Sequence, residues 1–546
     1  MSAIKYLLLF VFSFQVGAVP REGQRLMISA ASPEAVAVGE KIGLAGGNVV
    51  DVAVAVGMVM AVTSPYFAAL GGGGFAMLKM GKDVEVLDFR EIAPKATDPS
   101  HFLKLEKTAS TVGGHAVAVP GMLAGWWSLH KKYGKLKWSR IVDEAIRIAN
   151  SGFRVGGEWV RKTTDSKENF NAAGMKYLFK ADKSPLKAGD QLRQPQLAHA
   201  LRLIRDKGDK GFYQGPVAKD IVASVKQSGG VMSTQDLAEY RVRWLKPLTT
   251  DFAGYKLYLM PPPSSGGVVI QQALRLITDL RVLEKPALSA DEFHFLGEIQ
   301  SRAFRGRSLL GDPDFHKNPL TYLSSDAYMT QMRKSISARQ TAELKPLDEK
   351  TLTESTETTH FSVMDNQGHA VAITITLNGN YGSGVVSNRY GIALNNEMDD
   401  FTTRPGEPNM FGLVQGQGNV VEAGKRPLSS MSPALASLDD KVVMSLGAPG
   451  GPRIISSVLQ VLYRTLGRKM DLDMAIQAPR VHHQFLPNIL YVDAHRFSPE
   501  ILEDLKRRGH KIEDGWMARV YAVRLRDDGI LEAAYDARGE GAVGGY

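Results

Sequence analysis

Apolar residues recur at intervals of three and four through much of the first 330 residues of the chain. This spacing is typical of amphipathic helices that bury one face against a core. The run that begins at Ser32-Pro33-Glu34 also has the capping residue and early proline that start a helix. The pattern predicts helices over Ser32–Gly57, Gly121–Tyr133, Trp138–Asn150, Gln196–Lys207 and Val268–Asp279.

Two strand patterns interrupt this helical part. The glycine-rich stretch Leu70–Phe75 leads into the apolar run Ala76–Leu78, and Val84–Phe89 alternates apolar and polar residues up to Arg90. Alternation with a period of two indicates a strand with one buried face. We therefore expect two strands here, packed among the helices.

Residues 335–357 are polar and aperiodic, and we interpret them as an exposed linker. After this linker the pattern of apolar residues changes from helical spacing to that of strands. Two apolar runs, His360–Asp365 and His369–Leu377, are separated by the turn Asn366–Gly368, which predicts a β-hairpin. If the last residue of the first run pairs with the first residue of the second, Thr358 lies opposite Thr376. Facing side chains in such a ladder are about 5 Å apart, so their hydroxyls can form a hydrogen bond.

Further elements follow towards the C-terminus. Helical spacing returns over Arg453–Leu466, Leu472–Ala478 and Pro499–Arg508. Two alternating runs, Ala518–Arg526 and Ile530–Tyr535, predict a last hairpin.

Residues 1–18 have the features of a signal peptide. Lys5 precedes an apolar core, Tyr6–Phe12, and the small residues Val16-Gly17-Ala18 form a cleavage site after Ala18. The alternative is an uncleaved anchor, but this core is shorter than the roughly 20 apolar residues that a spanning helix needs. We expect a periplasmic or secreted protein without a stable membrane anchor.

Composition narrows the chemistry. Lys and Arg total 66 against 57 Asp and Glu among 546 residues, a net charge of +9 without a basic arm, so we expect no nucleic-acid partner. Cysteine is absent. That absence excludes disulfides, thiolate nucleophiles and cysteine-based metal sites.

Thr358 is the candidate nucleophile, in the sequence Glu357-Thr358-Thr359-His360. A threonine hydroxyl needs an adjacent base, and cleavage of the chain before Thr358 would supply the residue's own α-amine. The pKa of an α-amine is roughly 7.7–8, close to the optimum for a general base at neutral pH. The alternative is that Thr358 only begins a strand, where threonine is common.

A second candidate feature is Gly447–Ile454, which precedes a predicted helix with Pro452 at its first position. The N–H groups of Gly450 and Gly451 would lack intrahelical partners there. Two such donors suit the oxyanion of an acyl-transfer transition state. The alternatives are a plain glycine-rich helix start or an anion-binding nest.

These features recur together with many others in the order of one known family. The segments are Leu70–Phe75, Asp88–Pro94, Val117–Gly121, Pro261–Gly267, Gly311–Phe315, Thr358–His360, Leu394–Phe401, Lys425–Pro433, Pro449–Ile454 and Ala478–Gln484. On these segments the chain resembles the γ-glutamyltranspeptidase family of N-terminal-nucleophile hydrolases, over nearly its whole length after the signal peptide.

The resemblance implies an α+β fold, a four-layer αββα sandwich built jointly by two chains. A precursor would cleave itself between Glu357 and Thr358. The products would be a large subunit, residues 19–357, and a small catalytic subunit, residues 358–546, which form a heterodimer. The implied substrates are glutathione and other γ-glutamyl compounds, with water or an amino acid or peptide as acceptor, and the implied reaction needs no metal or organic cofactor.

The resemblance also assigns roles to single residues. Thr358 matches the nucleophile, Thr376 the hydroxyl that orients it, and Gly450 and Gly451 the oxyanion hole. Arg90 matches the guanidinium that binds the substrate α-carboxylate in a bidentate manner, so lysine should fail there. Two further groups match substrate contacts: Ser429 and Ser430 for the same carboxylate, and Asn378, Glu397 and Asp400 for the α-ammonium.

Simpler interpretations exist for several of these residues. Arg90-Glu91 could be a surface ion pair, and Asp399-Asp400 a solvated acidic turn. For His482-His483 we expect structural hydrogen bonds, because adjacent strand residues point to opposite faces and cannot share a metal ion.

The chain also departs from the family pattern. Phe411 lies in a stretch, Thr402–Ala423, that resembles the lid loop, at a place where bacterial members often have tyrosine. Pro452 and Ala448 each replace a serine found in many relatives. The match therefore supports the head-group chemistry more strongly than a ratio of transfer to hydrolysis.

Two rival functions remain open: a cephalosporin or glutaryl acylase on the same scaffold, and a binding protein that is never processed.

Overall fold

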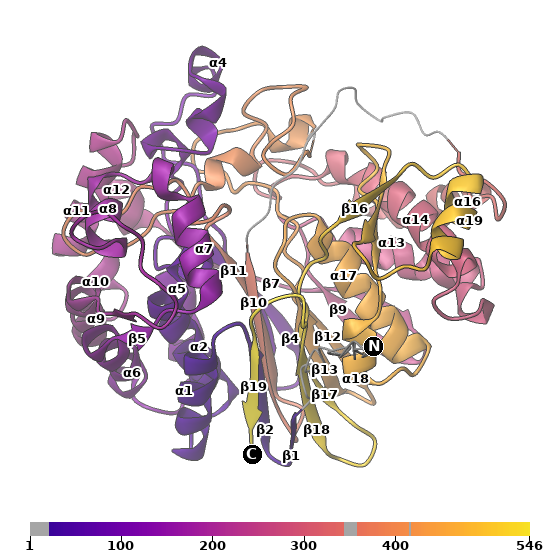
Figure 1. Ribbon diagram of the computed structural model, residues 1–546, viewed down its shortest axis with the longest axis horizontal. Coiled ribbons are helices and arrows are strands. Elements are labelled where there is room, and N and C mark those ends of the chain that lie inside the picture. The colour runs from indigo at the N-terminus through magenta and orange to yellow at the C-terminus, as the bar shows by residue number, and fades with distance from the viewer. Residues whose placement is uncertain (1–20, 343–357, 414–415) are drawn as a thin grey trace, which may run out of the picture.

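Two stacked antiparallel sheets form the centre of the molecule in the computed structural model, which describes residues 21–342, 358–413 and 416–546 (Figure 1). The first sheet contains, in spatial order, β19 (Ala542–Gly545), β2 (Leu26–Ala30), β10 (Thr359–Asp365), β11 (Ala370–Thr376), β3 (Gly73–Lys79), β4 (Val84–Phe89) and β7 (Arg243–Leu245). The second contains β1 (Arg21–Gly23), β18 (Leu531–Tyr535), β17 (Tyr521–Leu525), β13 (Lys441–Gly447), β12 (Ala434–Leu438), β9 (Tyr255–Leu259) and β8 (Leu248–Phe252).

Helices cover the outer face of each sheet, so the expected four-layer αββα sandwich is confirmed (Figure 1). Over the first sheet pack α1 (Pro33–Leu44), α2 (Val49–Thr63), α5 (Met122–Tyr133) and, behind them, α6 (Trp138–Ser151), α9 (Pro195–Lys207) and α11 (Gly215–Gln227). Over the second pack α13 (Gly266–Asp279), α17 (Arg453–Leu462) and α18 (Leu472–Gln477), with α14 (Ala290–Arg305), α16 (Asp326–Lys334) and α19 (Pro499–Arg507) outside them.

Shorter elements complete the periphery. The helices are α3 (Pro65–Ala68), α4 (His101–Lys104), α7 (Gly157–Asp165), α8 (Ala172–Leu178), α10 (Lys210–Tyr213), α12 (Thr234–Glu239) and α15 (Leu320–Leu323). Two small sheets consist of β14 (Val481–His482), β15 (Leu490–Asp493) and β16 (Ile512–Gly515), and of β5 (Phe153–Arg154) and β6 (Gln191–Leu192).

The β10–β11 hairpin lies at the centre of the first sheet and is buried on both faces. Its larger apolar residues, such as Phe361 and Ile373, pack against the helices, whereas the small residues Ala370 and Ala372 face the second sheet. This division follows from the alternation of side chains along a strand. His360 lies opposite Thr374, which is the predicted register.

The strand β4 begins at Val84 and ends at Phe89, as predicted. The prediction of a single helix over Ser32–Gly57 is wrong, because two helices, α1 and α2, cover this stretch. The chain breaks at Gly46, which has a φ of +91°, and a new helix starts at the Asn48 cap. The Asn48 side chain accepts the N–H of Asp51, and the Asp51 carboxylate accepts the N–H of Asn48, a capping box that begins α2.

Several predictions fall outside the described residues: the signal peptide 1–18, Glu357 at the scissile bond, and most of the linker 335–357. Among the described helices, none is both long and apolar enough to cross a membrane.

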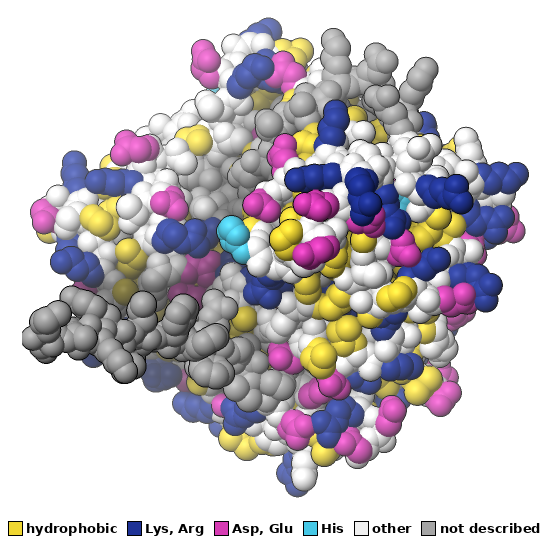
Figure 2. Space-filling view, turned by 45° about the vertical axis from the view of Figure 1, so that its right-hand side comes forward, with side chains coloured by type: hydrophobic (Ala, Val, Ile, Leu, Met, Phe, Trp, Pro, Cys, Tyr) yellow, Lys and Arg dark blue, Asp and Glu magenta, His cyan; other side chains and the backbone are white. Residues whose placement is uncertain are grey.

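Basic and acidic side chains are interspersed over the face seen in Figure 2, and the chain carries a modest net charge of +9.

Close approach of strands explains the glycines before and within β3. A β-carbon on Gly74 would lie 2.3 Å from the carbonyl oxygen of Thr374 on β11, whereas one on Gly81 would meet nothing within 4 Å. We predict that Gly74→Ala destabilises the protein by about 1–3 kcal/mol, because the strands must separate. The matched Gly81→Ala should change the stability by no more than about 0.5 kcal/mol. Thermal unfolding of both purified variants tests this, and equal midpoints would contradict it.

Candidate active site

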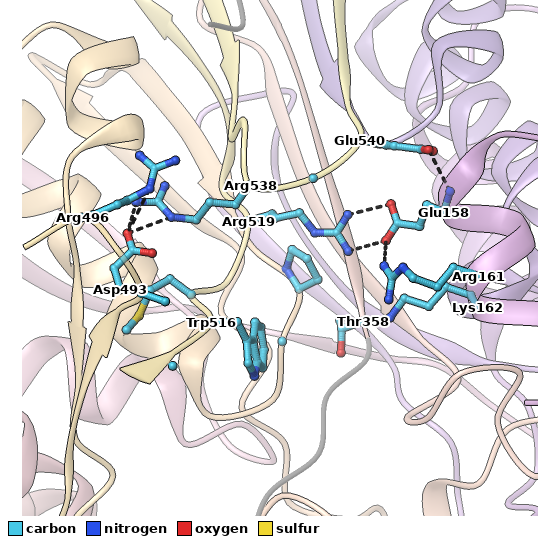
Figure 3. A pocket seen from close by; sticks show the side chains of 16 residues that line it. Glu158, Arg161, Lys162, Thr358, Asp493, Arg496, Trp516, Arg519, Arg538 and Glu540 are labelled. Atoms are coloured by element: carbon cyan, nitrogen blue, oxygen red, sulfur yellow. Dashed lines mark hydrogen bonds and ion pairs between the residues drawn. The ribbon is translucent and has the colours of Figure 1, made fainter. Parts of the chain in front are cut away.

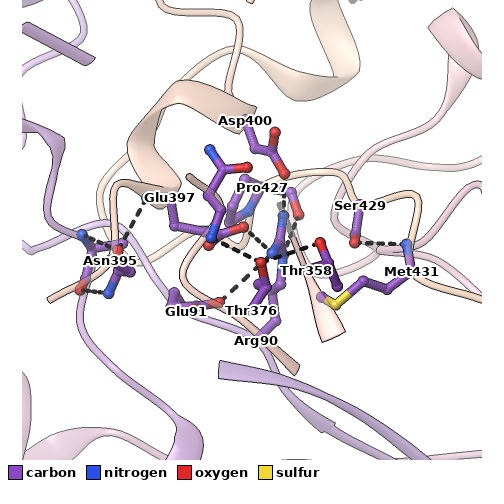
Figure 4. Close-up of polar contacts among 12 residues, drawn as sticks. Arg90, Glu91, Thr358, Thr376, Asn395, Glu397, Asp400, Pro427, Ser429 and Met431 are labelled. Carbon is purple, nitrogen blue, oxygen red and sulfur yellow. Dashed lines mark hydrogen bonds and ion pairs between the residues drawn. The ribbon is translucent and has the colours of Figure 1, made fainter. Parts of the chain in front are cut away.

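Thr358 and Thr376 meet at the end of the central hairpin. Thr358 directly precedes β10, Thr376 is the last residue of β11, and their hydroxyl oxygens are 3.3 Å apart (Figure 4). Both side chains are buried. The N–H of Asn378 donates to the Thr376 hydroxyl at 2.8 Å, which leaves the Thr376 proton able to point at Thr358. The contact that the sequence predicted is thus present.

The loop before α17 positions two glycine N–H groups near Thr358. Gly450 and Gly451 have φ values of +122° and +53°, a region that residues with a side chain rarely adopt. Neither N–H has a hydrogen-bond partner within the described residues. The helix begins at Arg453, and Pro452 is its N-cap. Pro452 therefore lies just before the first helical position, where the sequence had placed it.

Side chains crowd both glycines. A β-carbon on Gly450 would lie 2.7 Å from the Trp516 ring, and one on Gly451 would lie 2.7 Å from the Phe411 ring. Trp516 and Phe411 therefore pack directly on the backbone that carries the two N–H groups.

A buried charge cluster lies beside the threonines. The Arg90 guanidinium, just after β4, forms ion pairs with Glu397 and with Asp400, the latter at 2.5 Å (Figure 4). Glu91 is 3.7 Å from the same guanidinium. Arg90 and Glu91 are 1% and 0% exposed, so the surface ion pair considered from the sequence is wrong. Asp399 and Asp400 are likewise buried, so they do not form a solvated turn.

Burial shapes the protonation of this cluster. It raises the pKa of Glu91 to about 7 and also raises the pKa values of Glu397 and Asp400, although the charge of Arg90 opposes each shift. Three carboxyl groups lie close together around Arg90, so ionising all of them is costly. Oε2 of Glu397 and both carboxylate oxygens of Glu91 have no hydrogen-bond partner among the residues that the structure describes. The cluster can therefore accept further donors.

Other expected residues complete the same pocket. Ser429 Oγ accepts the N–H of Met431 at 3.1 Å, and the Asn378 side chain donates to the carbonyl of Asn396 at 3.1 Å. Ser430 is also buried here. The pocket, about 20 Å³ in volume, is lined by Arg90, Arg307, Thr358, Thr376, Asn378, Glu397, Asp400, Phe411, Leu413, Ser429, Ser430, Met431, Gly451 and Ile454.

This volume is close to what one water molecule requires. Phe411 and Leu413, from the stretch that resembles a lid, form part of the wall. At this size the pocket has no room for a larger ligand, which enters only when lining side chains move. Of the predicted site residues that the structure describes, Gly450 alone is not among the lining residues of this pocket, and it lines a neighbouring cavity that also contains Thr358.

Sequence reasoning missed Arg307, a second guanidinium in this pocket. Its Nε donates to Ser265 Oγ at 3.1 Å, and burial lowers its pKa to about 10 although Asp400 favours the charged form. It lies in a short turn after α14, with no motif or strand pattern around it. Only the packing of this turn against the pocket reveals it.

Buried histidines in this region serve structural contacts. His360 is hydrogen-bonded to Thr374 and Ser362, and burial lowers its pKa to about 3, so its ring is neutral. His482 contacts Ser456 and Gln484, whereas the neighbouring His483 contacts Asn488. The expected structural hydrogen bonds of the histidine pair are confirmed.

The charge cluster predicts a pH dependence of stability. A carboxyl group with a raised pKa in the folded state binds its proton more tightly than in the unfolded chain, so stability falls as the pH rises from about 5 through 7. We predict that Glu91→Gln removes part of this fall. The melting temperature of the wild type should decrease more than that of the variant between pH 5.5 and pH 8. Exposed Glu106→Gln is the control, and identical pH profiles for the wild type and Glu91→Gln would contradict the prediction.

Comparison with known proteins places this geometry in a family. A profile of the family described as gamma-glutamyltranspeptidase matches residues 35–546. The chain is 41% identical over 511 residues to the glutathione hydrolase proenzyme of Pseudomonas aeruginosa, covering 91% of this chain and 90% of that protein. It is 38% identical over 531 residues to the glutathione hydrolase proenzyme of Escherichia coli, covering 95% and 91%.

Solved structures agree with this assignment. The gamma-glutamyltranspeptidase of Helicobacter pylori superimposes with a TM-score of 0.56 at 34% identity, over 58% of this chain and 94% of that chain. The cephalosporin acylase of Bacillus halodurans superimposes with a TM-score of 0.87 over 99% of both chains, but at 24% identity it shares only the fold. The profile match and the two close relatives, each aligned over most of its length, establish that this chain belongs to the gamma-glutamyltranspeptidase family.

Proposed function

We propose that this protein is an autoprocessing gamma-glutamyltranspeptidase. It cleaves the γ-glutamyl amide of glutathione and related compounds through a γ-glutamyl-Thr358 ester, and it passes the γ-glutamyl group to water or to an amino acid or peptide. The observation that carries the proposal is the Thr358–Thr376 hydroxyl contact, which opens onto a pocket with a buried guanidinium and carboxylates. Membership of the family supports the choice of substrate.

Cleavage between Glu357 and Thr358 would give subunits of residues 19–357 and 358–546. The arrangement of strands supports a stable heterodimer after this cut. In the first sheet, β10 pairs with β2 and β11 pairs with β3, so two strands of the small subunit lie between strands of the large one. Their ladder hydrogen bonds and shared core would hold the subunits together.

In the mature enzyme the free α-amine of Thr358 accepts the hydroxyl proton, directly or through a water. The Thr376 hydroxyl, which accepts the Asn378 N–H, donates to Thr358 Oγ and orients it. Oγ attacks the γ-carbonyl carbon, and the Gly450 and Gly451 N–H groups stabilise the oxyanion. The leaving amine takes the proton from the α-amine. No metal or organic cofactor takes part.

The charge cluster around Arg90 would bind the glutamate head group of the substrate. Arg90, with Ser429 and Ser430, binds the α-carboxylate, and Asn378, Glu397 and Asp400 accept the α-ammonium. Glu397 and Asp400 already hold the Arg90 guanidinium, which therefore needs little reordering when a substrate binds. The unpartnered Oε2 of Glu397 supports its role as an ammonium acceptor.

We further propose that residues 1–18 direct export and are removed after Ala18, so that the enzyme acts in the periplasm or is secreted. The apolar core Tyr6–Phe12 and the small residues before the cut support this proposal.

The processing proposal has a direct test on a denaturing gel. The purified wild type should run as two bands, and N-terminal sequencing of the smaller band should begin at Thr358. Thr358→Ala removes the hydroxyl that attacks the preceding peptide bond and should remain one chain. Thr359→Ala, which changes the neighbouring hydroxyl, is the matched control and should be processed. A Thr358→Ala protein that still splits at this bond rules out autocatalysis, and an unsplit wild type favours the unprocessed binding protein.

Substrate choice separates the proposal from a glutaryl acylase, which would need no ammonium site. We predict that kcat/KM for γ-glutamyl-p-nitroanilide exceeds that for glutaryl-p-nitroanilide by about 10- to 100-fold, because glutaryl leaves buried carboxylates unpaired. Asp400→Asn should narrow this ratio, mainly by slowing the γ-glutamyl substrate. Asp399→Asn is the control, because that carboxylate accepts from Ser110 and from the Met410 N–H instead. A wild-type preference for glutaryl would overturn the assignment.

A further inference from the structure

Arg307 is a buried guanidinium in the small pocket, and the proposed mechanism gives it no role. It lies in the turn Gly306–Leu309 that follows α14, and it is 4% exposed. Thr358 also lines a second cavity of about 700 Å³, whose wall includes residues of α7 but not Arg307 (Figure 3). Of the two spaces beside Thr358, Arg307 therefore lines only the one that contains the charge cluster.

The guanidinium contacts the loop before α13. Its Nε donates to Ser265 Oγ at 3.1 Å, so the hydroxyl proton of Ser265 is left to donate to the Ser429 carbonyl at 3.0 Å. The Ser265 N–H donates to the same carbonyl at 2.9 Å, and the Ser429 N–H donates to the carbonyl of Pro263 at 2.7 Å. The backbone of Ser429 is therefore held from both sides, and Arg307 sets the direction of one of these bonds.

The charge of Arg307 also acts on Asp400. Burial raises the pKa of Asp400 and lowers that of Arg307 to about 10, and in both cases the charge of the other residue opposes the shift. The guanidinium therefore remains charged at neutral pH. It favours the ionised form of Asp400, the form that can accept an ammonium group.

The other groups around Asp400 come from three further parts of the chain. Arg90, after β4, pairs with its Oδ2 at 2.5 Å, and the Asn409 side chain donates to its Oδ1 at 3.2 Å. The carboxyl groups whose pKa the charge of Asp400 raises are Glu91, Glu397 and Asp399. Two guanidinium groups thus favour the charge of Asp400 against several nearby carboxyl groups.

We propose that Arg307 is a positioning residue for the glutamate head group: it holds the Ser429 backbone through Ser265, and it supplies a second positive charge beside Asp400. This inference rests on the proposed function, in which Ser429 binds the α-carboxylate and Asp400 accepts the α-ammonium. In this role Arg307 acts through these residues and does not itself contact the substrate. One side chain thereby fixes the groups that recognise both charges of the head group.

The test follows the ratio of kcat/KM for γ-glutamyl-p-nitroanilide to that for glutaryl-p-nitroanilide as the pH changes. Ionisation of the Thr358 α-amine affects both substrates alike and cancels in this ratio. Only the γ-glutamyl substrate carries an ammonium group for Asp400. Protonation of Asp400 removes its acceptor charge, so the ratio should fall as the pH decreases, and the midpoint of this fall reports the ionisation.

Two substitutions separate the charge of Arg307 from its hydrogen bond. Arg307→Met removes both, so the midpoint should move up by about one pH unit. At pH 7 the KM for the γ-glutamyl substrate should rise about tenfold in this variant, with kcat within about threefold. Arg307→Lys retains the charge, so its midpoint should stay within about 0.3 pH unit of the wild type, while KM rises about threefold. Ser265→Ala should behave like Arg307→Lys, because it removes the hydroxyl link to Ser429 and leaves the charge.

Arg302→Met is the control for the loss of a buried guanidinium. Arg302 lies on α14, is 2% exposed, and contacts Glu298 and Ser335 rather than the pocket. This variant should have a lower melting temperature than the wild type but the same KM and the same midpoint. An equal shift of the midpoint in Arg302→Met and Arg307→Met would mean that general destabilisation is the cause, and it would overturn the inference.

The remaining outcomes separate the inference from the proposed function. A wild type that releases no p-nitroaniline from the γ-glutamyl substrate overturns the proposed function. With an active wild type, an unshifted midpoint in Arg307→Met overturns the inference alone, as does an equal shift in Arg307→Lys. If Arg307→Met fails to mature, KM in Arg307→Lys and Ser265→Ala decides the result: the expected rise in both supports the inference, and an unchanged KM in either contradicts it.

Discussion

The antiparallel pairing of β10 with β11 is the constraint on which the rest of this structure depends. It determines which hydroxyl faces Thr358, because a shift of one residue would turn every side chain of the hairpin to the opposite face. The pairing also inserts the hairpin between β2 and β3, at the centre of a sheet whose strands come from both sides of the proposed cut. The same backbone contacts thus align the Thr358 and Thr376 hydroxyls and would hold a cleaved protein together.

Beside this hairpin the protein buries a cluster of charged groups. Arg90 and three carboxyl groups lie close together with almost no access to water, which raises the carboxyl pKa values and leaves acceptor atoms without partners. Burial of this kind costs stability unless a ligand supplies the missing donors. A zwitterionic head group would do so, with a carboxylate for the guanidinium and an ammonium for the carboxylates. The proposed substrate would thus supply the donors that the cluster lacks.

A second, larger cavity adjoins the pocket at Thr358. The pocket beside Arg90 is small and polar and has room for about one water molecule, whereas the neighbouring cavity has a volume of about 700 Å³ and is lined by side chains from distant parts of the chain. The ion pair between Glu158 and Arg519 spans the second space and links α7 to the segment before β17.

The sequence by itself determined the local features of this protein. Alternation and turn residues located the hairpin and its register, glycines marked the loop before α17, and ordered motifs identified the family. Local patterns extend only a few residues, however. They missed the break at Gly46, where a helical pattern continued across a glycine turn, and they gave no sign of Arg307. Whether Arg90 and Asp400 are buried, and which residues of α7 face Thr358, depends on contacts between segments far apart in the chain. Only the tertiary structure decided these points, because burial and charge pairing arise when the layers pack together.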